Sequence, residues 1–297
     1  MFQELPAHYH GTLGDYISNV YQPYFESLGL KSLPIERLRL DIIKTYEISD
    51  IPYTQITKND AISFFTQLRT ARDIGKASLN RYRSRLCNIF NYGIAEGHTY
   101  ANPFAQVKKL KEKPRKRVYS ISEINRVLEE CKSSKNSELY TIAVLALNTG
   151  MRKGELLKIE MKSVSLKQKN IYLPDYTTKS GESREIPLND AAFKVLKAHI
   201  ESHSPVVRTD SHGKTRIMLF KSKSIRTAWQ NALKRAGVEQ ATFHDLRRTF
   251  ATYLKDEGLS LHTIKELLGH SSITMTEIYL STQGSALYDG VSRISFC

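Results

Sequence analysis

A strongly basic stretch, residues 108–117, divides this 297-residue chain into two parts. Its sequence is KKLKEKPRKR, which holds seven basic residues and one acidic residue. Charge at this density is typical of a solvated linker. Since a chain of this length is expected to hold two domains, we predict one domain over residues 12–107, a basic linker over 108–117 and a second domain over 118–297.

The charge of the whole chain indicates a polyanionic partner. The formal net charge is +14, of which the linker contributes +6 and residues 1–107 only +1. Hydrophobic residues make up 40% of the chain, which is enough for packed cores. A basic excess of this size favours nucleic acid over a membrane. Because the chain has neither a run of 18 apolar residues nor a signal-peptide pattern, we expect a soluble, cytoplasmic protein.

The linker has two interpretations. It is either a solvated connection or a segment that crosses a nucleic-acid phosphate backbone. Its position between two folded parts favours the second interpretation. The side chains that this interpretation assigns to DNA binding are Lys108, Lys109, Lys111, Lys113, Arg115, Lys116 and Arg117.

Helical periodicity dominates the first part of the chain. Within residues 77–96, apolar side chains from Leu79 to Ile94 recur at helical spacing and form a single stripe. The opposite face carries Asn80, Arg83 and further polar residues. Such a face is either merely solvated or placed to pair with base edges, because arginine suits guanine and asparagine suits adenine. The first domain is therefore predicted to be all helical.

The second part predicts helices together with a small β-sheet. Residues 139–148 are almost all apolar, which indicates a buried helix. Two short strands, 170–174 and 184–188, flank a turn at Ser180-Gly181. Further helices are predicted from a cap at Ser120 and over 189–202, 223–236, 243–255 and 261–268, with another strand at 217–220. The fold class is thus mainly α with a small β-sheet.

Histidine and cysteine spacing gives no metal site. The histidines His199, His203 and His212 lack partners at ligand spacing, and we interpret them as surface residues. The three cysteines are far apart and form no C-x-x-C pair, so neither a disulfide nor a cysteine-based zinc site is predicted.

Several polar side chains in the second part are suited to act on a phosphodiester. His244 and Arg247 lie one turn apart near the start of a predicted helix, where an anion is favoured. His270 follows Gly269 directly, and Tyr279 comes nine residues later. Arginine and N–H-donating histidine stabilise charge on phosphoryl oxygens, and a tyrosine hydroxyl can be a covalent nucleophile. The alternative for Tyr279 is a packed core tyrosine.

Two more residues have simple alternatives when each is taken alone. Arg152 follows the buried helix, and the alternative to a site role is a surface arginine paired with Glu155. Lys179 lies on the turn of the predicted hairpin, where a solvated lysine is the alternative.

Together these segments resemble the tyrosine recombinases, the phage-integrase family. The resemblance rests on NTGMRKGELLKI, TTKSGESREIPL, HDLR, LGH and Tyr279, and it extends over roughly residues 12–279. It implies an all-helical core-binding domain followed by an α+β catalytic domain. It also implies that Glu155 supports the first arginine. The catalytic residues that the resemblance implies are Arg152, Lys179, His244, Arg247, His270 and Tyr279.

The implied reaction is site-specific DNA strand exchange through a 3′-phosphotyrosyl intermediate. Tyr279 attacks the scissile phosphate, while the two arginines brace the non-bridging oxygens and His270 adds a hydrogen bond. Lys179 protonates the departing 5′-oxygen, and His244 assists proton movement at the tyrosine. No metal and no cofactor are expected, because the arginines supply fixed charge and the chain has no acidic cluster or nucleotide-binding loop.

The expected partner is double-stranded DNA with specific recombination sites. The resemblance implies a homotetramer on paired sites, a monomer or weak oligomer without DNA, and room for accessory DNA-bending proteins. The favoured role is integration or excision of a phage or mobile element, in a prokaryotic cell or infected host, at the nucleoid when DNA is bound. The alternatives are a Xer-like dimer-resolution recombinase, a type IB topoisomerase-like enzyme and a DNA-binding regulator with a vestigial site.

Overall fold

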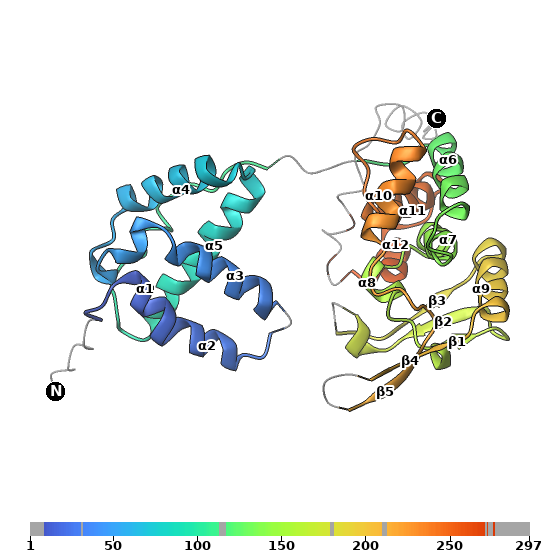
Figure 1. Ribbon diagram of the computed structural model, residues 1–297, viewed down its shortest axis with the longest axis horizontal. Helices are drawn as coiled ribbons and strands as arrows, with labels where there is room; N and C mark the ends of the chain where they lie inside the picture. Colours follow the sequence, from blue (N-terminus) through green and yellow to red (C-terminus); the bar gives the residue numbers. More distant parts are fainter. Residues whose placement is uncertain are drawn as a thin grey trace, which may run out of the picture. The chain divides into compact units, whose positions relative to one another are not determined.

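The structure is a computed structural model that describes residues 9–30, 32–112, 117–178, 181–209 and 213–270, together with Ser272 and Thr276. The chain divides into two compact units, Met1–Pro114 and Arg115–Cys297, and the division falls inside the basic stretch. Each unit has its own hydrophobic core. Figure 1 shows that both are built mainly from helices, with small sheets in the second unit, so the predicted fold class is confirmed.

The first unit consists of helices joined by short turns. Its α-helices are α1 (Leu13–Tyr16), α2 (Gln22–Ser27), α3 (Leu33–Lys44), α4 (Lys58–Arg72) and α5 (Lys76–Ala95). A π-helical turn, Ile17–Tyr21, separates α1 from α2. The beginning of α4 is fixed by a capping box, in which Thr57 and Asp60 satisfy each other's backbone N–H groups.

The long helix α5 supplies the central stripe of this core. Leu79, Leu86 and Phe90 of the predicted stripe are buried. Ile94 is an exception, because 41% of its surface is exposed near the C-terminal end of the helix. The predicted stripe was therefore wrong by one turn at that end, where the helix leaves the core.

The second unit combines helices with two small sheets. Its helices are α6 (Ile121–Lys132), α7 (Leu139–Thr149), α8 (Lys153–Leu156), α9 (Asp190–Ser202), α10 (Arg226–Arg235), α11 (His244–Asp256) and α12 (Leu261–Leu268). One antiparallel sheet has the order β1 (Val164–Ser165), β2 (Asn170–Leu173), β3 (Arg184–Pro187). The other pairs β4 (Val206–Thr209) with β5 (Thr215–Met218). The sequence patterns missed β1 and β4, which are short and lack a clear alternation.

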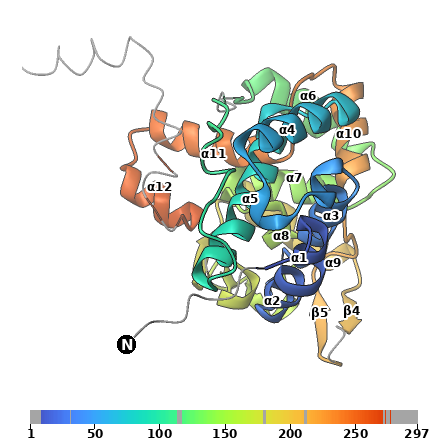
Figure 2. The same ribbon diagram turned by 90° about the vertical axis from the view of Figure 1, so that its left-hand side faces the viewer.

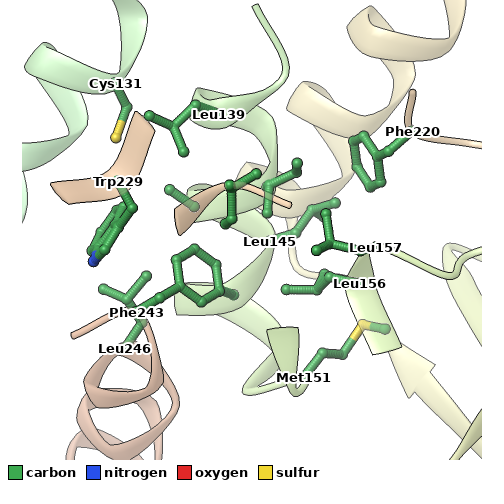
Figure 3. Packing of buried hydrophobic residues seen from close by; sticks show 14 of the residues in the cluster. Cys131, Leu139, Leu145, Met151, Leu156, Leu157, Phe220, Trp229, Phe243 and Leu246 are labelled. Atoms are coloured by element: carbon green, nitrogen blue, oxygen red, sulfur yellow. The ribbon is translucent and has the colours of Figure 1, made fainter. Parts of the chain in front are cut away.

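The buried helix α7 organises the core of the second unit. It packs against α6, α9 and α11, and its side chains are almost all buried. Figure 3 shows Leu139 and Leu145 of α7 close to Trp229, Phe243 and Leu246. Figures 1 and 2 show the β4–β5 hairpin at the lower edge of the second unit, away from α6, α7 and α11.

His199 is buried, contrary to the prediction of a surface histidine. Only 3% of its surface is exposed, its Nε2 lies 3.2 Å from the Leu219 carbonyl oxygen, and its ring stacks on His203. Burial lowers the pKa of His199, so the ring is neutral near pH 7. His203 is partly exposed, and His212 lies outside the described residues. Within the part of the chain that the structure describes, no helix is long and apolar enough to cross a membrane.

Candidate active site

Arg247 lies buried between the C-terminal ends of two helices. Its Nη1 donates to the carbonyl oxygen of Gly150, directly after α7, and its Nη2 donates to that of Leu268, the last residue of α12, both at 2.8 Å. Only 2% of its surface is exposed. The last carbonyls of a helix have no partner within the helix and carry partial negative charge. Two helix ends therefore compensate the burial of one guanidinium.

Glycine is required at the first of these ends. Gly150 caps α7 with φ +62°, in the left-handed region. A Cβ at this position would collide with the ring of Phe250 and with Leu268. The close approach of α11 and α12 to the end of α7 thus brings the carbonyl within reach of Arg247.

Arg152 meets the same region from the start of α8. Its Nη2 donates to the carbonyl oxygen of Gly269, at 3.1 Å. Its Nη1 donates to Oε1 of Glu155 at 2.9 Å, and its backbone N–H donates to Oε2 at 2.9 Å. Glu155 is the capping residue of this short helix and is 2% exposed. The sequence left open that Arg152 is a surface arginine paired with Glu155. The pair is present, but both side chains are largely buried.

A third arginine, Arg184, belongs to this cluster and was not predicted. It is the first residue of β3, and its fork contacts both oxygens of Glu155, at 2.7 and 3.3 Å. Burial alone raises the pKa of Glu155, but the hydrogen bonds and charge of Arg184, with those of Arg152, lower it below its usual value. Positions 155 and 184 are too far apart for any local sequence pattern to link them. The role of Arg184 becomes visible in the structure, where Arg152 and Arg184 contact the same carboxylate, that of Glu155.

His270 is held neutral beside the arginines. It is 6% exposed, and its Nδ1 lies 2.8 Å from the hydroxyl oxygen of Thr276. Burial, followed by the charges of Arg247, Arg152 and Arg184, lowers the pKa of His270 to about 3. A neutral imidazole can donate one hydrogen bond while it accepts another.

His244 begins α11 and remains exposed to solvent. Partial burial and then the charge of Arg247 lower the pKa of His244. Because His244 is in contact with solvent, these charges are screened more strongly here than at the buried His270.

An open hollow of about 450 Å³ adjoins this cluster. Arg184, Gly269 and His270 are among its lining residues, together with charged residues of β3 and α12. A larger hollow of about 1290 Å³ elsewhere on the second unit is lined by none of the predicted catalytic residues. Of the two hollows, the smaller one is lined by a predicted catalytic residue, His270, and its charged lining is mixed, with Arg184 and Lys265 beside three glutamates.

Two predicted catalytic residues, Lys179 and Tyr279, lie outside the described residues. Thr178, directly before position 179, belongs to the described residues. Thr178 is 3% exposed, and its hydroxyl lies within hydrogen-bonding distance of two carbonyl oxygens, Asp175 at 3.0 Å and Glu182 at 2.9 Å. The base of this turn is therefore closed next to Arg184.

The first half of the basic stretch is fastened to α5. The side-chain amide of Asn80 accepts a hydrogen bond from the Leu110 N–H, at 2.9 Å, and donates one to the Leu110 carbonyl oxygen, at 2.8 Å. Arg83 donates to the carbonyl oxygens of Val107 and Ala105. Two alternatives were predicted for the polar face that carries Asn80, a solvated surface or a surface that contacts DNA bases. Asn80 fits neither of them, because it is 4% exposed and its side chain is bonded to Leu110. We call residues 105–112 the docked segment.

The seven predicted DNA-binding residues have different settings. Lys108, Lys109 and Lys111 are exposed on the docked segment. Arg117 pairs with Glu123, at 2.5 and 3.1 Å, and lies over the ring of Tyr119. The residues outside the described part of the chain are Lys113, Arg115 and Lys116.

The cluster can bind and polarise an anion. Its three arginines and one glutamate leave an excess of positive charge, and a neutral histidine lies beside them. Such groups stabilise charge that develops on phosphoryl oxygens. Among the described residues no group of three or more histidine, cysteine, aspartate or glutamate side chains is arranged to hold a metal ion.

Comparison with known protein families matches residues 117–285 to the phage integrase family, which is more than half of the chain. The chain belongs to the phage integrase family. The family predicted from the sequence motifs is thereby confirmed, and the match includes every residue of the arginine cluster.

Relatives within the family share about a third or less of their residues with the chain. The integrase of Salmonella phage P22 is 32% identical over 164 residues, covering 53% of the chain and 41% of that protein. The shufflon-specific DNA recombinase of Escherichia coli is 28% identical, covering 87% and 63%. The tyrosine recombinase XerD of Listeria innocua is 28% identical, covering 75% and 77%. The chain thus spans less than two thirds of the first two relatives.

Solved integrase structures have the same fold. The Tn1549 transposon integrase in complex with a circular intermediate DNA has a TM-score of 0.81 at 18% identity, covering 96% of the chain and 100% of that one. A λ integrase dimer bound to a core site has a TM-score of 0.74 at 24% identity, covering 92% and 96%. A λ integrase tetramer bound to a Holliday junction has a TM-score of 0.73 at 24% identity, covering 91% and 77%.

Proposed function

We propose that this chain is a site-specific DNA recombinase that cuts and rejoins strands through a covalent link between Tyr279 and a 3′-phosphate. The observation that carries the proposal is the meeting of Arg152, Arg247 and His270 at the ends of α7 and α12. These side chains come from distant parts of the sequence, and they form a preorganised site for a phosphate. Membership of the phage integrase family supports the same reaction.

The arginines stabilise the transition state in this proposal. Arg152 and Arg247 are held by helix-end carbonyls, so little reorganisation is needed when charge builds up on the non-bridging oxygens. Fixed guanidinium charges supply what Mg²⁺ supplies in many other phosphoryl-transfer enzymes. Glu155 orients Arg152 through its side chain and its backbone N–H.

His270 acts as a neutral hydrogen-bond donor in the proposed mechanism. Its pKa of about 3 leaves the ring uncharged at neutral pH. When Nδ1 accepts a hydrogen bond from the Thr276 hydroxyl, the ring proton lies on Nε2, and in this proposal Nε2 donates to a phosphate oxygen in the DNA complex. A bound phosphate would favour the protonated ring and raise this pKa.

The remaining roles follow the family motifs. Tyr279 is the nucleophile, with a hydroxyl that becomes a phosphodiester oxygen when the 5′-oxygen leaves. Lys179 protonates that leaving oxygen, and His244 assists proton movement at the tyrosine. The bond energy is kept in the phosphotyrosyl link, so the reverse attack by a 5′-hydroxyl rejoins the strand without ATP.

The proposed partner is double-stranded DNA with specific recombination sites. The exposed lysines of the docked segment are ordered by Asn80, which lowers the entropy lost when they contact phosphates. By analogy with λ integrase, which is bound to a core site as a dimer and to a Holliday junction as a tetramer, we propose a homotetramer on paired sites, with accessory DNA-bending proteins. The action takes place on DNA in the cytoplasm of a prokaryotic cell.

The proposed biological role is integration or excision of a mobile element. The similarity to the P22 and Tn1549 integrases favours it. Resolution of chromosome dimers is a second candidate, because the similarity to XerD covers about three quarters of both chains.

Covalent trapping tests the proposed reaction. The purified chain is incubated with sheared, end-labelled genomic DNA from the source organism, denatured with detergent and separated from free DNA. Wild-type protein should carry DNA linked at Tyr279, and sequencing the linked ends gives the cleavage site. Tyr279→Phe should bind DNA with unchanged affinity and carry none, because only the hydroxyl is removed. An adduct that persists in the Phe variant refutes Tyr279 as the nucleophile, and wild-type protein without any adduct refutes the function.

A further inference from the structure

Arg184 joins three elements of the candidate active site. Its Nη2 lies 2.7 Å from Oε2 of Glu155 and its Nη1 lies 3.3 Å from Oε1, so β3 is tied to α8. Arg152 contacts the same carboxylate with a single side-chain nitrogen. On its other side Arg184 lies against the end of α12, because a Cβ at Gly269 would approach the guanidinium to 2.7–2.9 Å.

Counting charges shows what the second arginine changes. Arg152 and Glu155 alone would form a neutral pair, and the carboxylate would offset much of the attraction between Arg152 and a phosphate at short range. The fork of Arg184 instead forms a bidentate pair with Glu155, which is the stronger geometry. The trio therefore keeps one excess positive charge.

Exposure indicates which arginine carries that charge toward a ligand. The Arg152 side chain is 18% exposed and that of Arg184 is 11% exposed. All four terminal nitrogens are hydrogen-bonded, but both of Arg184 contact the Glu155 carboxylate, whereas Arg152 gives one to that anion and the other to an uncharged helix-end carbonyl. Of the two, Arg152 is the more accessible to a phosphate.

We propose that Arg184 is a positioning residue for strand cleavage: by neutralising and orienting Glu155, it leaves the charge of Arg152 available to the scissile phosphate. This inference rests on the proposed DNA-cleaving function. Arg184 itself makes no contact with DNA in this role. Its loss allows Glu155 to pair wholly with Arg152, which slows the chemical step and leaves DNA binding nearly unchanged.

The test is a charge-rescue experiment on the full-length chain. The substrate is a nicked duplex that carries the cleavage site recovered by covalent trapping, and the rate of covalent complex formation is measured in single turnover. Arg184→Gln should be about 100-fold slower than wild type, the usual loss when one preorganised cation is compromised. Its dissociation constant for the duplex should stay within about threefold, since few phosphate contacts are affected.

Removal of the carboxylate should rescue this variant. In the double variant Arg184→Gln, Glu155→Gln, no anion offsets Arg152, and the cleavage rate should rise at least about tenfold above that of Arg184→Gln. A purely structural role for Arg184 predicts no rescue, because the double variant lacks both partners. Arg184→Lys keeps the charge, so adding Glu155→Gln to it should bring no acceleration.

Arg235→Gln is the matched control. Arg235 pairs with Glu130 on the surface of α10 and α6, where both side chains are more than 30% exposed, and its variant should cleave at the wild-type rate. A slow Arg235→Gln would show that removing any basic residue slows cleavage, which would overturn the specific role of Arg184.

Two results decide against the proposal directly. A double variant as slow as Arg184→Gln, or an Arg184→Gln that cleaves like wild type, overturns it while leaving the proposed function intact. Wild-type protein that forms no covalent complex refutes both. If Arg184→Gln does not fold by circular dichroism, Arg184→Met keeps the volume without the charge, and the same rescue by Glu155→Gln is required.

Discussion

Replacing Arg247 should destabilise the second unit as well as stop the proposed strand cleavage. Arg247→Met keeps most of the side-chain volume but leaves the carbonyls of Gly150 and Leu268 without their charged donors. A hydrogen bond to a charged group contributes about 1.5–3 kcal/mol, so two contribute about 3–6 kcal/mol. Removing the cost of burying a guanidinium offsets part of this loss. We expect a net loss of roughly 3 kcal/mol in the free energy of unfolding.

Trp229 provides the assay. It is the single tryptophan of the chain, it is 3% exposed, and its ring lies 5.0 Å from that of Phe243 in the core of the second unit. Its fluorescence therefore reports unfolding of this unit even where the first unit unfolds separately. With a urea dependence of about 2 kcal/mol per molar, the midpoint of Arg247→Met should fall by about 1–2 M.

Arg152→Met is the comparison variant. Arg152 donates to one helix-end carbonyl, and Glu155 keeps Arg184 when Arg152 is replaced. Its urea midpoint should fall by less than half as much as that of Arg247→Met. Free energies of unfolding for wild type and Arg247→Met that agree to within about 0.5 kcal/mol would refute the argument that this arginine holds two helix ends together.

Three further predictions follow from the same interactions. Changing the three lysines of the docked segment to glutamine should reduce the slope of log affinity for DNA against log salt concentration by about 0.9 for each phosphate that is no longer neutralised. Asn80→Ala should weaken binding several-fold at an unchanged slope, because it removes the ordering of the segment and keeps its charges. Gel shifts at several salt concentrations distinguish these two effects. The pKa of His270 is near 3 when folded and about 6.5 when unfolded, so the folded state binds fewer protons between these values and stability falls as the pH drops below about 6.5. His270→Gln should remove about 2–3 kcal/mol of the stability change between pH 7 and about pH 4.5, and an unchanged pH dependence of the Trp229 midpoint would contradict the neutral-histidine assignment. Gly150→Ala should cost at least about 2 kcal/mol, because φ is +62° and the added methyl meets Phe250; a wild-type midpoint would show that the end of α7 can shift.

Local features of this protein could be predicted because their causes lie within a few residues. The cap at Ser120 and the buried character of α7 each depend on neighbours one to four positions away. The charge of residues 108–117 likewise divides the chain without any knowledge of the fold. The motifs around Arg152 and Arg247 identified the family, and with it the expected set of catalytic side chains.

Tertiary structure decided which of these side chains meet and what surrounds them. Arg247 bonds residues 97 and 21 positions away, and Arg184 bonds Glu155 from 29 positions away. Asn80, 30 positions from Leu110, holds the docked segment instead of facing solvent. Burial and partners at such separations depend on how helices pack, and sequence spacing carries no record of it. For that reason Arg152 and Arg247 could be predicted from their sequence motifs, whereas the role of Arg184 could be recognised only from its contacts in the folded chain.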